Sequence, residues 1–115
     1  INGDVVQAGM SIYRHLLSGP DAGIAKEDIA ERLAYFCFCA KNWSESRSLL
    51  ERGGEPRTAE GRFCLAVMLK SGHGGRIRKA DGIRMIRQAE AMDGFFAQAA
   101  AVVKQRWMAE DLSNL

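Results

Sequence analysis

The stretch from residue 61 to residue 102 constrains the fold of this chain more than any other part of it. Two apolar patterns with helical steps of three and four residues flank the glycine-rich turn Ser71-Gly72-His73-Gly74-Gly75. A small residue followed four and five positions later by an apolar pair occurs at Gly61 and again at Ala97, a step of 36 residues. A helix pair that recurs with a period in the mid-thirties is typical of an α-solenoid, in which each pair buries its apolar faces against its neighbours.

The rest of the chain is also helical in its periodicity. Helices are predicted over residues 5–17, 24–40, 44–52, 56–70, 79–91 and 95–110, and no alternating strand pattern of useful length occurs. Asp4 and Ser44 are the predicted caps of the first and third helices, and Pro56 is expected in the first turn of the fourth. Connections of two to eight residues imply antiparallel neighbours. The predicted fold class is therefore all-α, with about six helices stacked as a right-handed solenoid segment in a single domain over residues 1–115.

Large apolar residues at helical spacing give the expected core. Its members are Leu33, Phe36, Leu50, Phe63, Leu65, Met68, Ile83, Ile86 and Ala97.

The order of small, apolar and glycine residues in 61–102 is similar to that of a known repeat. Gly61 precedes Leu65-Ala66 and Leu69, the turn carries Gly72-His73-Gly74, and the second helix continues with Asp81-Gly82, Met85-Ile86, Ala89 and Gly94. This spacing resembles the Sel-1-like repeat, a relative of the tetratricopeptide repeat, although Leu69 replaces an aromatic residue and Asp81-Gly82 replaces Lys-Ala. Residues 24–53 resemble only a shorter pair of the tetratricopeptide type, and a tetratricopeptide consensus is the competing description of the whole chain.

The resemblance implies a non-catalytic scaffold or adaptor that binds another protein or a peptide. In this family the first helices of the pairs line a concave surface, and here those are the second, fourth and sixth helices. Binding energy concentrates on Tyr, Trp and Arg, so an aromatic anchor with polar neighbours is expected on that surface. The candidate partner-binding residues are Arg32, Tyr35, Arg62, Lys70, Gln98 and Gln105.

Charge is distributed unevenly over a chain whose formal net charge is only +2. Residues 1–55 carry a net charge of −2, and residues 56–115 carry +4. Such an imbalance would steer an acidic partner. The alternative function is a helical nucleic-acid-binding domain whose cations track phosphates. That alternative is weakened by the low net charge and by the lack of interleaved aromatic residues. The residues that would contact phosphates in this alternative are called the basic cluster; they are Arg76, Arg78, Lys79, Arg84 and Arg87.

The residues of reactive chemistry form no recognisable pattern. Cys37, Cys39 and Cys64 lie among apolar residues, and His15 and His73 lie on different segments, so neither zinc spacing nor a Ser-His-Asp arrangement is visible. We therefore expect no enzyme activity, no metal and no cofactor. Unpaired thiols favour a reducing compartment such as the cytoplasm, and no apolar run approaches the 20 or so residues that a membrane helix needs. The start at Ile1 rather than Met predicts that the sequence is a piece of a longer protein.

Overall fold

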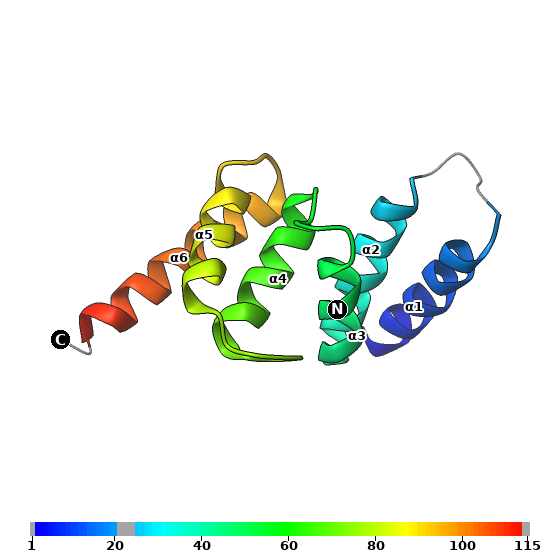
Figure 1. Cartoon of the computed structure of the whole chain (residues 1–115), viewed down its shortest axis with the longest axis horizontal. Coiled ribbons are helices and arrows are strands. Elements are labelled where there is room, and N and C mark those ends of the chain that lie inside the picture. Colours follow the sequence, from blue (N-terminus) through cyan, green and yellow to red (C-terminus); the bar gives the residue numbers. More distant parts are fainter. Residues whose placement is uncertain (1, 21–24, 114–115) are drawn as a thin grey trace.

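The computed structural model describes residues 2–20 and 25–113, and this part of the chain is entirely helical (Figure 1). The helices are α1 (Gly3–Ser18), α2 (Lys26–Cys39), α3 (Trp43–Glu51), α4 (Ala59–Ser71), α5 (Lys79–Glu90) and α6 (Phe95–Ser113). The predicted all-α class and the predicted six helices are confirmed for the described residues, among which there is no strand. The predicted start of the second helix at residue 24 lies outside them.

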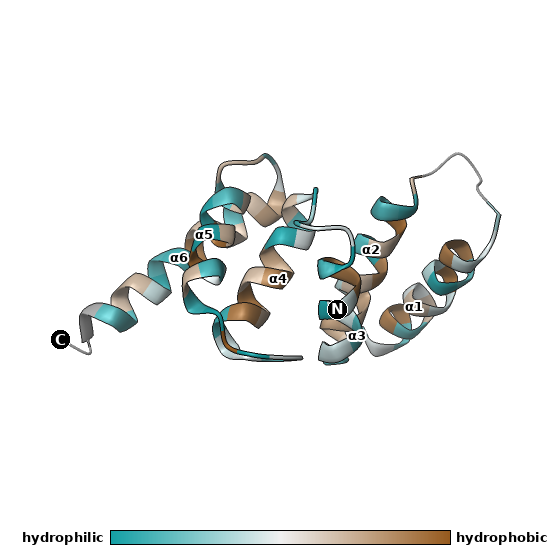
Figure 2. Cartoon of the chain, in the orientation of Figure 1, coloured by the Kyte–Doolittle hydropathy of each residue, from teal (hydrophilic) through white to brown (hydrophobic). Residues whose placement is uncertain are grey.

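The helices follow one another along a body whose principal extents are 52 × 25 × 25 Å, from α1 at the right of Figure 1 to the end of α6 at the left. Each helix packs on the next in chain order, so the predicted packing of α4 on α5 and of α5 on α6 is confirmed. In addition, α2 contacts α4, and α4 contacts α6. These contacts bring the three even-numbered helices side by side, with α4 in the middle. Its middle and C-terminal parts are hydrophobic (Figure 2), as its central position requires.

Helix starts differ from the predicted caps. α1 begins at Gly3 and is capped by Asn2, whose side chain accepts a hydrogen bond from the Asp4 N–H at 2.7 Å, so the prediction that Asp4 is the cap was wrong. Ser44 is likewise not a cap, because α3 already begins at Trp43. α4 begins after its cap Thr58, which leaves Pro56 outside the first turn. In each case the periodic pattern placed the helix correctly, but several polar residues near its start could serve as the cap.

The predicted core is confirmed at six of nine positions. Leu33, Leu50, Leu65, Met68, Ile86 and Ala97 are 7% exposed or less. The other three, Phe36, Phe63 and Ile83, are only partly buried. The two phenylalanines pack against the core without being enclosed by it; Phe36 stacks on Tyr13 of α1, and Phe63 contacts Phe96 of α6.

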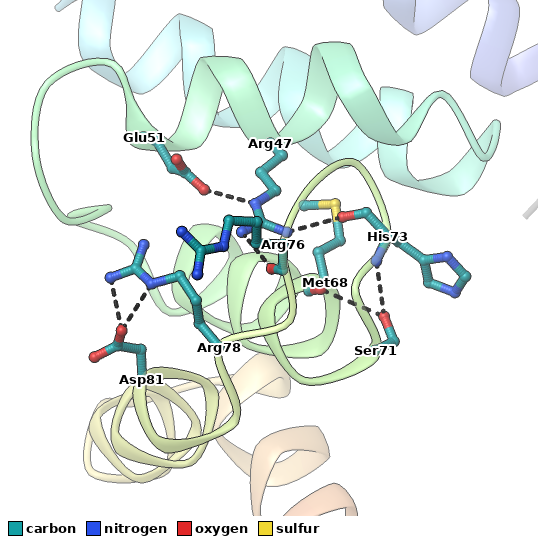
Figure 3. A network of polar contacts seen from close by, with 8 residues as sticks. All are labelled: Arg47, Glu51, Met68, Ser71, His73, Arg76, Arg78 and Asp81. Atoms are coloured by element: carbon teal, nitrogen blue, oxygen red, sulfur yellow. Dashed lines mark hydrogen bonds and ion pairs between the residues drawn. The ribbon is translucent and has the colours of Figure 1, made fainter.

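The glycine turn between α4 and α5 is held by an arginine from α3 (Figure 3). Arg47 has a side chain only 7% exposed, and it donates to the carbonyl oxygens of His73 (3.3 Å) and Arg76 (2.8 Å) and to Glu51 (2.7 Å). Gly72 ends α4 with φ 82°, a left-handed conformation that favours glycine. The turn is therefore fixed both by its own backbone geometry and by α3.

A buried carboxylate joins α2 to the start of α4. Glu31 is 6% exposed and accepts hydrogen bonds from the Arg57 N–H (2.9 Å), the Thr58 N–H (2.9 Å) and the Thr58 hydroxyl (2.6 Å). A negative charge is favourable at a helix N-terminus, where N–H groups lack partners within the helix. Glu31 therefore sets the position of α4 relative to α2, and with it the surface that the two helices share.

Candidate functional site

A continuous row of aromatic rings runs from α1 across α2 and α4 to α6. Its ring centroids are 5.1 to 5.7 Å apart, within the range of favourable aromatic pairs. Tyr35 of α2 touches Phe96 of α6, and Phe96 touches Phe63 of α4. The row thus joins helices that are far apart in sequence. We call this set the aromatic row; its members are Tyr13, Phe36, Tyr35, Phe96, Phe63 and Phe95.

The aromatic row packs against the core on one side and is accessible to solvent on the other. Phe95 is 73% exposed, and the other five rings are partly buried. Partial exposure of several neighbouring rings leaves apolar area that can be removed from water only by another molecule. The row therefore has the composition of the centre of a protein interface.

Tyr35, the predicted aromatic anchor, lies in the middle of the row. Burial is the main reason that its pKa is raised to about 12, and the Cys39 thiol acts in the same direction. The phenol is neutral at physiological pH, as an ordinary tyrosine also is, and its hydroxyl can donate a hydrogen bond.

The charged residues Arg32 and Glu60 lie at one end of the row. Arg32 Nη1 is 3.4 Å from Glu60 Oε2, and the arginine side chain is 50% exposed while the glutamate side chain is only 13% exposed. Burial is the main cause of a raised Glu60 pKa, which Arg32 opposes and Glu31 reinforces. The two residues border a pocket of about 250 Å³ between α1, α2 and the start of α4.

Lys70 lies near the opposite end of the same surface. Its ammonium group is 5.0 Å from the ring centroid of Trp107 and 3.6 Å from Glu110 Oε2, both on α6. The contact with the ring is a cation–π interaction. Lys70 therefore ties α4 to α6, and 21% of its side chain stays accessible.

The structure does not bring the remaining predicted binding residues together with these. Arg62 is partly buried and uses its Nε to donate to the Pro56 carbonyl at 2.7 Å, which gives it a structural role at the start of α4. Gln98 and Gln105 are exposed on α6, where their spacing places them on one stripe with Phe95 and Val102. That stripe adjoins the aromatic row only at Phe95.

The basic cluster of the alternative hypothesis is partly neutralised by carboxylates. Arg78 pairs with Asp81 at 2.6 Å, and Arg84 pairs with Glu55 and with Asp81. The other three cations, Arg76, Lys79 and Arg87, are exposed and form no ion pair with any described residue. The free positive charge on this side is therefore smaller than the sequence indicated.

Several residues of the site were not among the predicted binding residues. Phe63 was assigned to the core, and Phe95, Phe96 and Glu60 were not singled out. The signal that could have found them is the recurrence of an aromatic residue in each first helix, at Tyr35, Phe63 and Phe96. A core assignment from periodicity alone cannot separate rings inside the protein from rings at its surface.

Reactive groups do not gather elsewhere in the described part of the chain. Cys37, Cys39 and Cys64 are free thiols, and burial raises the pKa of Cys37 to about 11. No group of three or more His, Cys, Asp or Glu side chains among the described residues could hold a metal ion. None of the described helices is long and apolar enough to cross a membrane.

The chain matches no protein-family model, no curated protein and no solved structure.

Proposed function

We propose that this chain is a non-catalytic helical-repeat module of the Sel-1-like type that binds a protein or peptide on the surface of α2, α4 and α6. The observation that carries the proposal is the aromatic row, because its rings are supported by the core and remain open to a partner. Rigid aromatic side chains give large contact area at a low entropic cost. Tyr35 and Phe96 are the central anchors, with Phe95 as the most exposed contact.

The repeat architecture is supported by the pattern of helix contacts. In a solenoid of helix pairs the first helices of successive pairs adjoin, and α2, α4 and α6 do so through the α2–α4 and α4–α6 contacts. The 36-residue recurrence of Gly61 at Ala97 further supports treating α4 and α6 as equivalent helices of successive pairs. The second helices α3 and α5 would then lie on the outer side, together with the basic cluster.

Binding of a peptide can be tested with a randomised displayed-peptide library selected on the folded chain. Peptides that bind with micromolar or better affinity are expected, and Phe95→Ala is expected to weaken them about 10-fold, as for an interface residue that costs more than about 1 kcal/mol when truncated. Ile77→Ala is the matched control, because Ile77 is also apolar and 58% exposed but lies on the connection between α4 and α5. Equal losses in both variants, or no selected peptide, would contradict the proposal.

Nucleic-acid binding by the basic cluster is supported only by its three unpaired cations. It predicts that affinity for duplex DNA falls with a log–log salt slope of about −0.9 for each phosphate neutralised. We instead expect weak binding that disappears near physiological salt, where the Debye length is about 8 Å. A steep slope, retained in Phe95→Ala and lost in a variant that changes both Arg76 and Lys79 to Ala, would favour the nucleic-acid function.

A further inference from the structure

The pocket at the end of the aromatic row has more negative than positive charge. Three carboxylates line it, from Asp28, Glu31 and Glu60, whereas Arg32 is the only cation among the described residues that line it. Tyr13, the ring that begins the row, also lines it, so the pocket and the row form one continuous surface. A partner that covers the row therefore brings some of its own side chains over this pocket.

The carboxylates of the pocket are not equally satisfied. Glu31 accepts hydrogen bonds from three donors at the start of α4, so both of its oxygens have partners. Glu60 faces Arg32 with one oxygen, Oε2, at 3.4 Å. Its other oxygen, Oε1, is buried and has no hydrogen-bond partner among the described residues. Burial of an incompletely satisfied carboxylate is unfavourable, and a positive charge within about 4–6 Å would offset that cost without contacting Oε1 itself.

We propose that this pocket receives a lysine or arginine side chain of the bound partner, next to the apolar residue that packs on the aromatic row. The proposal rests on the proposed function and adds the chemistry of the partner segment to it. Complementary charge is the reason for choosing a basic segment, because the carboxylates of the pocket outnumber its cation and one more cation would reduce that excess. The ring of Tyr13, which lines the pocket, offers the cation an additional aromatic contact.

A basic segment differs from the acidic partner that the charge of residues 56–115 suggested. Half of the basic residues of that segment lie on α5 and on the connection before it, outside the surface of the aromatic row, and Arg78 and Arg84 among them are paired with carboxylates. The local charge of the docking surface decides which side chain it accepts, whereas the charge of the whole segment acts mainly on the association rate.

The library selection tests this inference separately from the proposed function. Selected peptides are expected to carry Lys or Arg within a few residues of an aromatic or aliphatic residue. For such a peptide, Glu60→Gln should weaken binding at least about 10-fold, as expected when one member of a desolvated charge pair is removed. Glu55→Gln is the matched control, since Glu55 is another arginine-paired carboxylate but lies on the α3–α4 connection. It should change the affinity less than about 3-fold.

A double-mutant cycle completes the test. Replacing the basic residue of the peptide by norleucine should cost the same factor as Glu60→Gln, and the combination should cost little more than either change alone. Peptides that depend on Phe95 but lack basic residues, or that bind Glu60→Gln unchanged, would overturn the inference and leave the proposed function intact. Failure to select any peptide would overturn both. Circular dichroism of Glu60→Gln establishes that the fold is retained in each case.

Discussion

Replacing Gly61 by alanine is expected to destabilise the protein, although the same change usually stabilises a helix. Gly61 lies in the first turn of α4. Its N–H donates to the hydroxyl oxygen of the cap residue Thr58, and that hydroxyl donates to Glu31. A Cβ atom at this position would lie 2.9 Å from Pro56 Cβ and 3.1 Å from Thr58 Oγ1, and it would lie closest of all to Glu31 Oε1. At least one of these groups must move.

The size of the effect follows from two opposing contributions. Alanine is favoured over glycine in a helix interior by up to about 1 kcal/mol. Forcing an extra carbon into a packed site costs about 1–3 kcal/mol, and a displaced Glu31 loses charge-assisted hydrogen bonds worth about 1.5–3 kcal/mol each. If one such bond is lost, the net loss should be roughly 1.5–5 kcal/mol, which corresponds to a Tm lower by roughly 7–25 °C in a domain of this size.

Urea unfolding followed by circular dichroism measures the effect, and Gly3→Ala provides the control. Gly3 is also helical, but an added Cβ atom there has no neighbour within 4 Å. Gly3→Ala should therefore leave the free energy of unfolding unchanged or slightly higher. If Gly61→Ala were as stable as wild type, the Glu31 cap would not be the tight junction between α2 and α4 described above.

Four further substitutions have expected outcomes. Leu65→Ala should lower the free energy of unfolding by roughly 2–5 kcal/mol in urea titrations, because Leu65 is 3% exposed and its loss leaves a cavity. Arg47→Met should cost about 1–3 kcal/mol and speed amide exchange in the glycine turn, since two turn carbonyls lose their donor. The hydrogen bond from Arg14 lowers the Glu45 pKa, so this pair stabilises the protein above the usual carboxyl pKa of 4.5, and the stabilisation is lost as the pH falls through the lowered value. Because both side chains are partly exposed, Glu45→Gln should remove only about 0.2–1 kcal/mol at pH 7 and nothing in acid. The raised pKa of Glu60 has the opposite effect on stability, because the folded state favours the neutral carboxyl more than the unfolded state does. Glu60→Gln should therefore have a Tm at pH 7 equal to or above that of wild type.

The sequence was sufficient to predict the helices and the position of the glycine turn. Apolar steps of three and four residues are a local signal, and Leu65, Met68 and Ile86 lie in the core where the pattern placed them. The left-handed Gly72 at the end of α4 also follows from local chemistry, because a helix end often needs a residue that tolerates positive φ.

The contacts between helices could not be predicted in the same way. Arg47 reaches carbonyl groups 26 and 29 residues further along the chain, and Glu31 reaches donors 26 and 27 residues away. Such pairs depend on how the helices cross, and residue spacing within one helix carries no information about that. For the same reason Tyr35 could be proposed as an anchor from its residue type, whereas its contact with Phe96 could not.

Chemical-shift mapping of a selected peptide on the ¹⁵N-labelled chain tests the central claim most directly. The largest shifts are expected in α2, α4 and α6, at and around Tyr35, Phe63 and Phe96, and they should diminish in Phe95→Ala at the same peptide concentration. Shifts confined to α3, α5 and the basic cluster would place the binding surface on the opposite side and contradict the account.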